Sequence, residues 1–356
     1  MFVKKDLRKV PQILTDATSR VNEDGSDVIT ELSFARRAPE FSPGNVSILL
    51  KPSFRPALDN LMQLSLYDCG LKSLMEIEQC PLGDDDSPLF PKLQRLDIGR
   101  NPLLVNDSLS STFHTQFPSL LELWCDNCSF GPSIPNTLLQ LHLLEVVRMT
   151  GNRLQDFEDA IGNTYWRQLK VLALDGNNLE RVGTGIGKLT RLEKLHLRQN
   201  KLVSLPEGVP SSLNSKLVMI SLSSNQLSSL PDSLVDVGSS LKELYLNGNQ
   251  IQELPMGIGE KLLGLTKLNL AHNKLGADAI PSGIEEADDD TNVLPVDFVE
   301  RFGLPVALTG NCTKDETCVV QMEGNPLVER RKRRLLEEEK TRAKDMAMEV
   351  DEDDAS

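Results

Sequence analysis

A C-x-x-C pair, Cys125 and Cys128 in "LWCDNCSF", is the arrangement in this chain that most directly suggests chemistry. Two cysteines at this spacing can supply half of a zinc site or a dithiol redox pair. Zinc would need two further ligands, and a thioredoxin-like pair opens a helix. The residues that follow are instead "SFGPSIP", which contain a glycine and two prolines. We therefore expect both cysteines to be structural.

The segment "GTGIGKLT" at 183–190 resembles a phosphate-binding loop only superficially. If Gly187 and Lys188 take their places in G-x-x-x-x-G-K-[ST], the first glycine falls on Val182 and the hydroxyl residue on Leu189. The four histidines are scattered outside any metal-binding spacing, and no G-x-S-x-G motif occurs. The sequence thus predicts no enzyme, no metal, no cofactor and no small-molecule substrate.

A repeated stretch of eleven residues occupies most of the chain. Positions 4, 6 and 11 are apolar and position 9 is Asn or Cys, as in "LKVLALDGNNL" and "LEKLHLRQNKL". Apolar residues two apart share one face of a short strand, and one copy cannot cover its own leucines, so the copies must stack. The copies begin at residues 61, 93, 120, 144, 169, 192, 217, 241, 265 and 317. Position 9 is filled by Cys69, Asn101, Cys128, Asn152, Asn177, Asn200, Asn225, Asn249, Asn273 and Asn325.

This pattern resembles the leucine-rich repeat family, L-x-x-L-x-L-x-x-N/C-x-L, over about residues 58–330. The resemblance implies an α/β solenoid, a horseshoe with a short-stranded parallel sheet on its concave face and an irregular or short-helical convex side. The Asn side chains at position 9 are expected to form a ladder, because a buried turn needs partners for its backbone groups. In the same register Cys125 fills position 6 and Cys128 fills position 9, which explains their spacing.

Three regions follow from this register. Residues 1–57 are expected to form an N-terminal cap with a degenerate repeat, in which Leu32 and Phe34 take positions 4 and 6 and Arg37 takes position 9. Residues 58–328 form the solenoid, with insertions near 80–90 and 281–303. Residues 329–356 form a charged helix that covers the last repeat and frays into "EVDEDDAS". Another copy could begin at Gly303, but it would compete with the copy at 317, and both alternatives stay open.

Charge and hydropathy bear on partners and location. The net charge is −14, and the acidic residues gather in short runs at 84–86, 285–290 and the C-terminus. Nucleic acid is therefore not an expected partner. The N-terminus has no apolar segment typical of a secretory signal, and no run is long enough to cross a bilayer. We expect a cytoplasmic protein, with the nucleus as a second compartment, because "RRKRR" at 330–334 is either an import signal or a solvated helix face.

The predicted concave face carries the candidate binding residues. Side chains at positions 3, 5 and 7 point to solvent, and aromatic residues and arginine, which dominate interface energetics, recur at positions 5 and 7. Trp124 and Arg148 should meet across strands in a cation–π contact, and Asp175 should pair with Arg198. The predicted partner-binding residues are Tyr67, Trp124, Arg148, His196, Arg198 and Tyr245.

We interpret the chain as a non-catalytic scaffold or adaptor that binds another protein, in intracellular signalling. Replacing Trp124 or Tyr245 by alanine should then abolish partner capture. Two alternatives stay open. One is a secreted or receptor-type recognition module in which Cys312 and Cys318 form a capping disulfide. The other is a nuclear leucine-rich acidic protein that regulates a phosphatase or binds histones.

Overall fold

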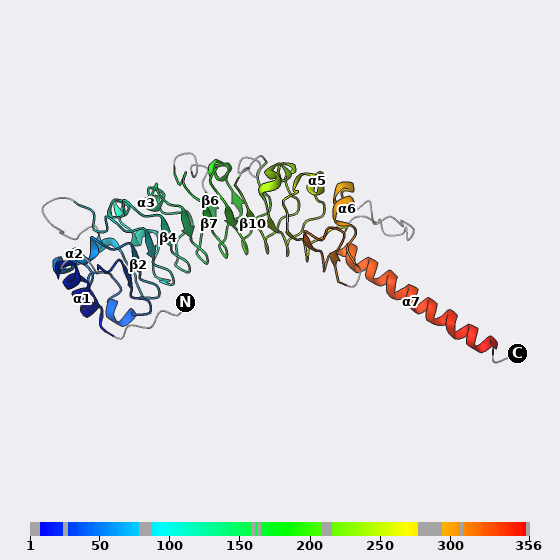
Figure 1. Ribbon diagram of the computed structural model, residues 1–356, viewed down its shortest axis with the longest axis horizontal. Coiled ribbons are helices and arrows are strands. Elements are labelled where there is room, and N and C mark those ends of the chain that lie inside the picture. The colour runs from blue at the N-terminus through cyan, green and yellow to red at the C-terminus, as the bar shows by residue number, and fades with distance from the viewer. Residues whose placement is uncertain are drawn as a thin grey trace. The chain divides into compact units, whose positions relative to one another are not determined.

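The computed structural model describes residues 8–23, 28–77, 87–157, 161, 165–207, 216–276, 294–306 and 309–353. The side chains of residues 22–23 and 344–353 are outside this description. The chain divides into two compact units, Met1–Lys201 and Leu202–Ser356. Each unit is a stack of repeats in which a three-residue strand is followed by a turn and a return segment (Figure 1).

The strands of the first unit form a parallel sheet in the order of the sequence. Equivalent repeat positions pair directly, as Leu64 pairs with Leu96 and Leu172 with Leu195. The side chains at positions 4 and 6 are buried and those at positions 3 and 5 face the other side, as the two-residue period requires. The strands are β1 (Glu31–Ser33), β2 (Gln63–Ser65), β3 (Arg95–Asp97), β4 (Glu122–Trp124), β5 (Val146–Arg148), β7 (Val171–Ala173) and β9 (Lys194–His196).

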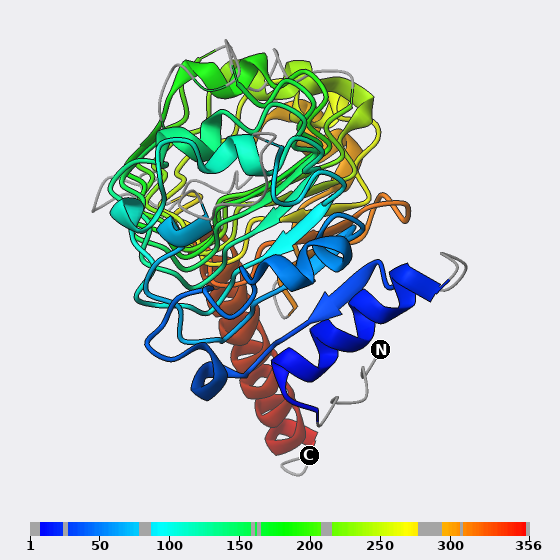
Figure 2. The same cartoon turned by 90° about the vertical axis from the view of Figure 1, so that its left-hand side faces the viewer.

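The beginning of the first unit contains a genuine strand. β1 pairs with β2, and Leu32 and Phe34 are buried at positions 4 and 6. Arg37, at position 9, is 8% exposed and donates hydrogen bonds to the Arg8 carbonyl and the Glu40 carboxylate. The helix α1 (Val10–Glu23) lies at this end beside β1 and buries an apolar face, as Figure 2 shows in dark blue.

The second unit repeats the same arrangement with one exception. The strands β10 (Met219–Ser221), β11 (Glu243–Tyr245), β12 (Lys267–Asn269) and β14 (Val319–Gln321) pair in parallel. The copy beginning at 317 is therefore the regular repeat. The alternative copy at Gly303 does not form one, because β13 (Asn311–Cys312) pairs antiparallel with β14.

Short helices and turns make up the return segments, on the side opposite the strands in each unit (Figure 1). The segment 183–190, which resembles a phosphate loop, is one of them, and its Ile186 and Leu189 are fully buried. A two-stranded ladder, β6 (Asp156–Phe157) with β8 (Arg181–Val182), also lies in these segments. The helices are η1 (Ala38–Phe41), η2 (Pro52–Phe54), α2 (Arg55–Leu58), η3 (Met75–Ile77), η4 (Asn106–Ser108), η5 (Phe113–Gln116), α3 (Asn136–Leu139), η6 (Thr184–Lys188), η7 (Asp232–Ser240), α5 (Ile258–Lys261) and α6 (Val296–Phe302).

The helix α6 holds α5 at both ends. The Asp297 carboxylate accepts hydrogen bonds from the N–H groups of Gly257 and Gly259, at 3.3 and 2.6 Å, beside the N-terminus of α5. At the other end, the Arg301 guanidinium donates to the Gly259 and Leu262 carbonyls, at 3.1 and 2.9 Å. Each charge thus neutralises the partial charge of the helix end that it faces.

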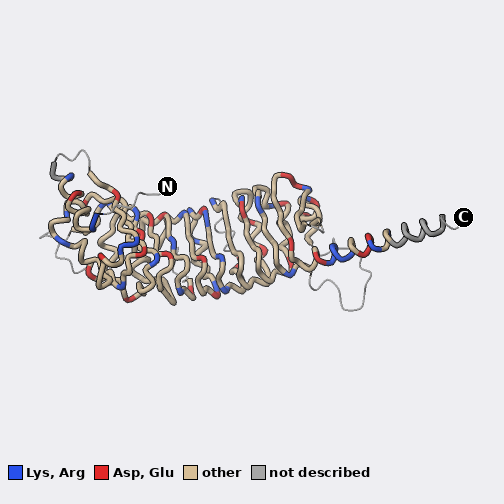
Figure 3. Tube along the Cα trace, turned by 90° about the horizontal axis from the view of Figure 1, so that it is seen from below, with Lys and Arg blue, Asp and Glu red and all other residues tan. Residues whose placement is uncertain are grey.

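The C-terminal helix α7 (Pro326–Asp353) covers the last repeat with its N-terminal turns. Leu327 and Val328 are buried, and Arg330 donates to the Gly276 carbonyl. Figure 3 shows basic residues followed by acidic ones along the next turns. The helix continues to Asp353, so the predicted fraying into the segment "EVDEDDAS" is wrong for residues 349–353.

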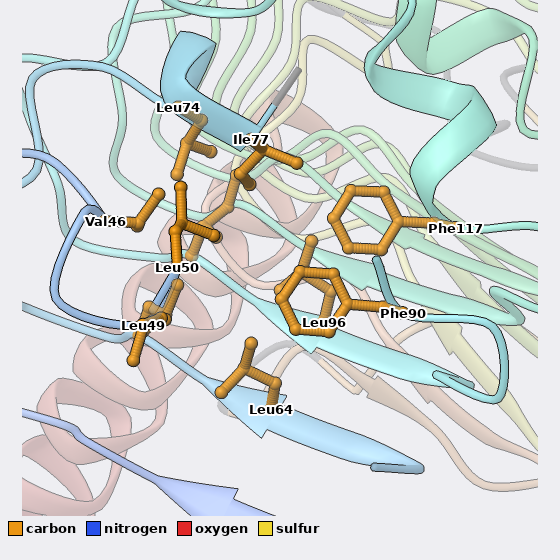
Figure 4. A pocket seen from close by; sticks show the side chains of 11 residues that line it. Val46, Leu49, Leu50, Leu64, Leu74, Ile77, Phe90, Leu96 and Phe117 are labelled. Carbon is orange, nitrogen blue, oxygen red and sulfur yellow. The ribbon is translucent and has the colours of Figure 1, made fainter. Parts of the chain in front are cut away.

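A small apolar hollow lies in the core of the first unit, between the strands and the return segments (Figure 4). Its volume is about 10 Å³, no more than that of one water-sized sphere. Leucines of β2 and β3 and the rings of Phe90 and Phe117 line it. No polar surface lines it, so it is a packing imperfection and offers a ligand no hydrogen bond.

Parts of two predicted insertions, 83–86 and 281–293, lie outside the described residues, as does Cys80.

Candidate functional site

The position-9 side chains lie just after each strand and hold the turn that follows it. Asn177 shows the arrangement: its Oδ1 accepts from the Leu154 N–H at 3.1 Å, and its Nδ2 donates to the Met149 and Leu174 carbonyls at 2.9 Å. One amide thus satisfies backbone groups of two successive repeats. Asn101, Asn152, Asn200, Asn249, Asn273 and Asn325 bond in the same way, and Asn225 is buried at the same position.

The two cysteines at position 9 form only some of the hydrogen bonds that the asparagines form. The Cys69 and Cys128 thiols donate to the Phe34 and Ile98 carbonyls of the preceding repeats, at 3.0 and 3.4 Å. A thiol is a weak acceptor, so Cys128 does not replace the amide oxygen for the repeat before it. In that repeat the turn shifts by one residue. Leu103, at position 11, is 55% exposed, and Leu104 is buried instead.

The C-x-x-C pair is chemically inert. Cys125 is fully buried and Cys128 is 5% exposed, and burial raises the pKa of the Cys128 thiol to about 12 and that of Cys125 well above its ordinary value. Both thiols are therefore protonated at neutral pH and are poor nucleophiles and metal ligands. Among the described residues, no group of three or more His, Cys, Asp or Glu side chains could hold a metal ion.

Trp124 forms the centre of the strand face of the first unit, by which we mean the side chains at positions 3, 5 and 7. The indole ring lies between two guanidinium groups, with Arg95 at 4.9 Å and Arg148 at 5.0 Å from its centroid. The contact between Trp124 and Arg148 follows from their direct pairing across β4 and β5. We call these three residues the Arg–Trp–Arg cluster.

Carboxylates hold both arginines in place. Glu122 accepts two hydrogen bonds from Arg95, at 2.7 and 2.9 Å, in a bidentate pair. Asp126 lies 2.7 Å from Arg148. Because a planar guanidinium held at its edge keeps its face available, these pairs orient both arginines against the ring.

Burial dominates the electrostatics beside the cluster. It raises the pKa of Asp97 and of Asp175 and lowers the pKa of His196. His196 is thus a neutral imidazole at neutral pH, since its ordinary pKa is about 6.5. The nearby Asp126 further raises the pKa of both aspartates, so this part of the face already carries unfavourably crowded negative charge.

The remaining predicted residues of the first unit lie on the same face without joining the cluster. Tyr67 is half-buried beside Gly99, where an added Cβ would come within 3.2 Å of its ring. Asp175 and Arg198 are in contact, but through the Arg198 backbone N–H, which donates to Asp175 Oδ1 at 2.6 Å. Burial has the larger effect on the pKa of the Asp175 carboxyl and raises it, but the Arg198 charge acts to lower it, so the two charges do interact.

Tyr245 belongs to the second unit and to a different arrangement. Its hydroxyl donates to Glu243 at 2.8 Å, and Glu243 also accepts from Lys267 at 3.1 Å. The next repeats continue this pattern, as Asn269 donates to Gln321 at 2.8 Å.

Arg95 belongs to the cluster but is not among the residues predicted from the sequence. It occupies position 3, whereas all the predicted residues lie at positions 5 and 7. A long side chain at position 3 reaches the ring on the next strand, so an arginine one strand before a position-5 tryptophan is the sequence signal for this contact.

The sequence of this chain is similar to those of several known proteins. A leucine rich repeat family model matches residues 167–227 and a second matches residues 240–260. Mouse (Mus musculus) lumican is 33% identical over 242 residues, which are 67% of this chain and 67% of lumican. Bovine (Bos taurus) osteomodulin is 30% identical over 181 residues, 43% of this chain, and the match covers 39% of osteomodulin. The chain thus spans well under two thirds of that relative.

Solved structures show the same fold at low identity. A leucine-rich repeat protein of Leptospira interrogans superposes with a TM-score of 0.61 and 22% identity, over 91% of this chain and 77% of that one. The ectodomain of the plant membrane receptor kinase GASSHO1/SCHENGEN3 of Arabidopsis thaliana gives a TM-score of 0.57 and 19% identity, over 85% of this chain and 31% of that one. With the parallel strands, the asparagine ladder and these relatives, the chain belongs to the leucine-rich repeat family.

Proposed function

We propose that this protein is a non-catalytic adaptor that binds another protein through the strand face of its first unit. Leucine-rich repeat proteins generally act as binding scaffolds, and this chain conforms to their fold. The observation that carries the proposal is the Arg–Trp–Arg cluster, because tryptophan and arginine dominate interface energetics and here they lie pre-oriented on one face.

The cluster is suited to binding because its geometry is fixed before a partner arrives. Trp124 is half-buried and Arg148, with a side chain 44% exposed, is already held by Asp126. Side chains that are immobilised in advance lose little entropy on association. The match to a probable serine/threonine-protein kinase of Dictyostelium discoideum covers only 6% of that protein and gives no support to an enzymatic role.

Affinity capture with matched variants tests the proposal. We expect Trp124→Ala to weaken capture of the partner by at least about tenfold, the size of an interface hot spot. Tyr245→Ala, on the polar network of the second unit, should weaken it less. Met256→Ala serves as the control, because Met256 is 68% exposed and lies outside the strand face. Equal capture by wild type and Trp124→Ala, with unchanged circular dichroism, would refute the proposal.

We also propose that the protein acts in the cytoplasm, in signalling. The support is the state of its cysteines. All five described cysteines are free and buried, and burial raises the pKa of Cys312 to about 12 and of Cys318 to about 11. Free thiols are typical of a reducing compartment. The mass of the protein isolated from its source under alkylating conditions tests this, because a disulfide would leave two cysteines unmodified.

The basic segment 330–334 supports a nuclear location less well than the free cysteines support a cytoplasmic one. Arg330 is engaged by the Gly276 carbonyl, and the segment is part of α7. Within the described part of the chain, no helix is long and apolar enough to span a membrane.

A further inference from the structure

The guanidinium of Arg55 contacts a serine in the insertion predicted near residues 80–90. Arg55 begins the helix α2 in the return segments of the first unit. Its Nη2 donates hydrogen bonds to the Ser87 Oγ at 2.9 Å and to the Pro88 carbonyl at 2.7 Å. A fixed positive charge therefore lies directly against the Ser87 hydroxyl.

The same guanidinium has a nitrogen whose hydrogen bonds are not used. The Arg55 Nε donates to the Asp59 carboxylate, one helical turn further along the chain. The Nη1 atom is buried and has no hydrogen-bond partner among the described residues. A buried N–H group without an acceptor costs free energy, and the cost is larger for a charged group. One further acceptor would complete the hydrogen bonding of Arg55.

A phosphate group on Ser87 would supply this acceptor. The two terminal nitrogens of a guanidinium form a planar fork that matches two oxygens of a phosphate. Nη2 already lies at hydrogen-bond distance from the oxygen that would carry the phosphorus. Because Nη1 is closed to water, a group attached to the neighbouring serine can reach it more readily than a free ion can.

The sequence and the backbone at Ser87 suit modification by a protein kinase. Ser87 is followed directly by Pro88, which is the pattern that proline-directed protein kinases accept. Both residues are half-buried and lie outside helices and strands, where the backbone can adapt to an enzyme. The next residues are anchored, since the Leu89 and Phe90 N–H groups donate to Gln116 at 2.8 and 3.2 Å. A phosphate at Ser87 would therefore stay beside Arg55.

We propose that Ser87 is phosphorylated by a proline-directed protein kinase and that Arg55 binds the phosphate through both terminal nitrogens. The Ser87 Oγ attacks the γ-phosphorus of a nucleoside triphosphate, and the bond from that phosphorus to the β–γ bridging oxygen breaks. The nucleoside diphosphate leaves, and the hydroxyl proton passes to the kinase. The modification goes beyond partner binding, and its occurrence in the cell rests on the cytoplasmic location proposed above.

The charges around Ser87 decide the sign of the test. The ordinary second pKa of a phosphoserine is about 6. A guanidinium in contact favours the dianion and lowers this pKa. The Asp59 carboxylate, which shares Arg55, and the three aspartates at 84–86, which precede Ser87 in the sequence, act to raise it. A lowered pKa thus requires Arg55 to outweigh these carboxylates, as a direct contact does.

Phosphorus NMR of the full-length protein tests the contact with Arg55. Phosphoserine is incorporated during translation at position 87 or, as the matched control, at position 42, the other serine that precedes a proline. Ser42 is exposed and has no hydrogen bond to an arginine in the part of the chain that the structure describes. We expect the second pKa to be lower by about 1 at position 87 than at position 42. Arg55→Gln should abolish this difference.

Incubation of the unmodified folded protein with a proline-directed kinase and a nucleoside triphosphate tests the modification itself. We expect mass spectrometry of peptides to locate a phosphate on Ser87. Pro88→Ala, which keeps the backbone carbonyl that Arg55 binds, should abolish this phosphorylation.

Each part of the proposal has a result that overturns it. If Ser87 of the folded protein gains no phosphate, the modification is refuted. If the second pKa is equal at positions 87 and 42, the contact with Arg55 is refuted, and this comparison decides even where Arg55→Gln does not fold. Neither result bears on partner capture through Trp124 or on the thiols of the isolated protein, so failure of the proposed function remains a separate outcome.

Discussion

The strand faces of the two units use the same backbone register to different ends. In the first unit, Arg95, Trp124 and Arg148 place planar groups one above another along the sheet. In the second unit, the corresponding side chains bond to one another in polar pairs, such as Ser223 with Asn247 at 2.6 Å and Asn269 with Gln321 at 2.8 Å.

The difference shows what decides whether a repeat face is available for binding. Polar pairs in the second unit consume the donors and acceptors that a partner would need. In the first unit, by contrast, the Arg148 side chain stays 44% exposed while it lies against the Trp124 ring. The two faces therefore differ in how much of their polar surface is already paired within the protein.

The largest expected effect is on stability. Trp124→Ala should lower the free energy of unfolding by about 2–3 kcal/mol, because it removes a half-buried ring and the surface against which two arginines pack. Tyr245→Ala should cost about 1 kcal/mol, since it removes one hydrogen bond and a less enclosed ring. Urea unfolding followed by circular dichroism measures both. Equal losses would remove the contrast between the two faces.

The coupling energies of two ion pairs, one on each strand face, should differ by a smaller amount. A double-mutant cycle on Arg95 and Glu122 should give a coupling of about 1 kcal/mol, because the pair is bidentate and partly buried. The cycle on Lys267 and Glu243, a single contact with a lysine side chain 54% exposed, should give about 0.3 kcal/mol. A larger coupling energy for Lys267 would show that bidentate geometry does not account for the fixed position of Arg95 on the strand face of the first unit.

A transplant sharpens the comparison further. The Trp124 and Arg148 cycle should show a coupling of about 0.5–1 kcal/mol. Tyr245→Trp with Asn269→Arg reproduces their cross-strand pairing in the second unit. Its coupling should stay below about 0.5 kcal/mol. The reason is that Asn247 stands where Asp126 orients Arg148, and Met219 stands where Arg95 covers the other face of the ring. A coupling energy equal to that of Trp124 and Arg148 would mean that the cation–π contact needs neither the Asp126 carboxylate nor Arg95.

The smallest expected effect is a pH dependence of stability that arises on the strand face of the first unit. Burial raises the pKa of Asp97 and Asp175 in the folded protein, so the folded state binds their protons more tightly than the unfolded state. Stability should therefore fall as the pH rises through these raised values, and should recover below their ordinary pKa of about 4. Asp97→Asn should make this slope shallower in thermal unfolding scans between acidic and neutral pH. Asp232→Asn, at an exposed acid of the second unit, should leave the slope unchanged.

Much of the fold was predictable because each repeat position has one physical task. The inward leucines and the position-9 side chains follow from a two-residue strand period and from the need to satisfy a buried turn. The exception at Leu103 and Leu104 could not be predicted from an apolar pattern, because both residues are leucine. It depends on which hydrogen-bond acceptor the next repeat offers, and there the next repeat has Cys128.

The candidate site was predictable in part for a related reason. Register alone placed Trp124 beside Arg148, but Arg95 reaches the ring diagonally, and diagonal contacts depend on side-chain length and rotamer. The antiparallel strand β13 was likewise beyond the repeat pattern, since Asn311 fits position 9 equally well in the register of a copy that does not form.

The clamp of α6 on α5 has a consequence for handling the protein. The acidic segment between Gly276 and Leu294 joins these helices covalently, yet Asp297 and Arg301 also join them through hydrogen bonds at both ends of α5. A preparation nicked by a protease in that segment should elute from a sizing column as an intact protein. Its two polypeptides would separate only under denaturing electrophoresis, so a single chromatographic peak is not a sign of an uncut chain.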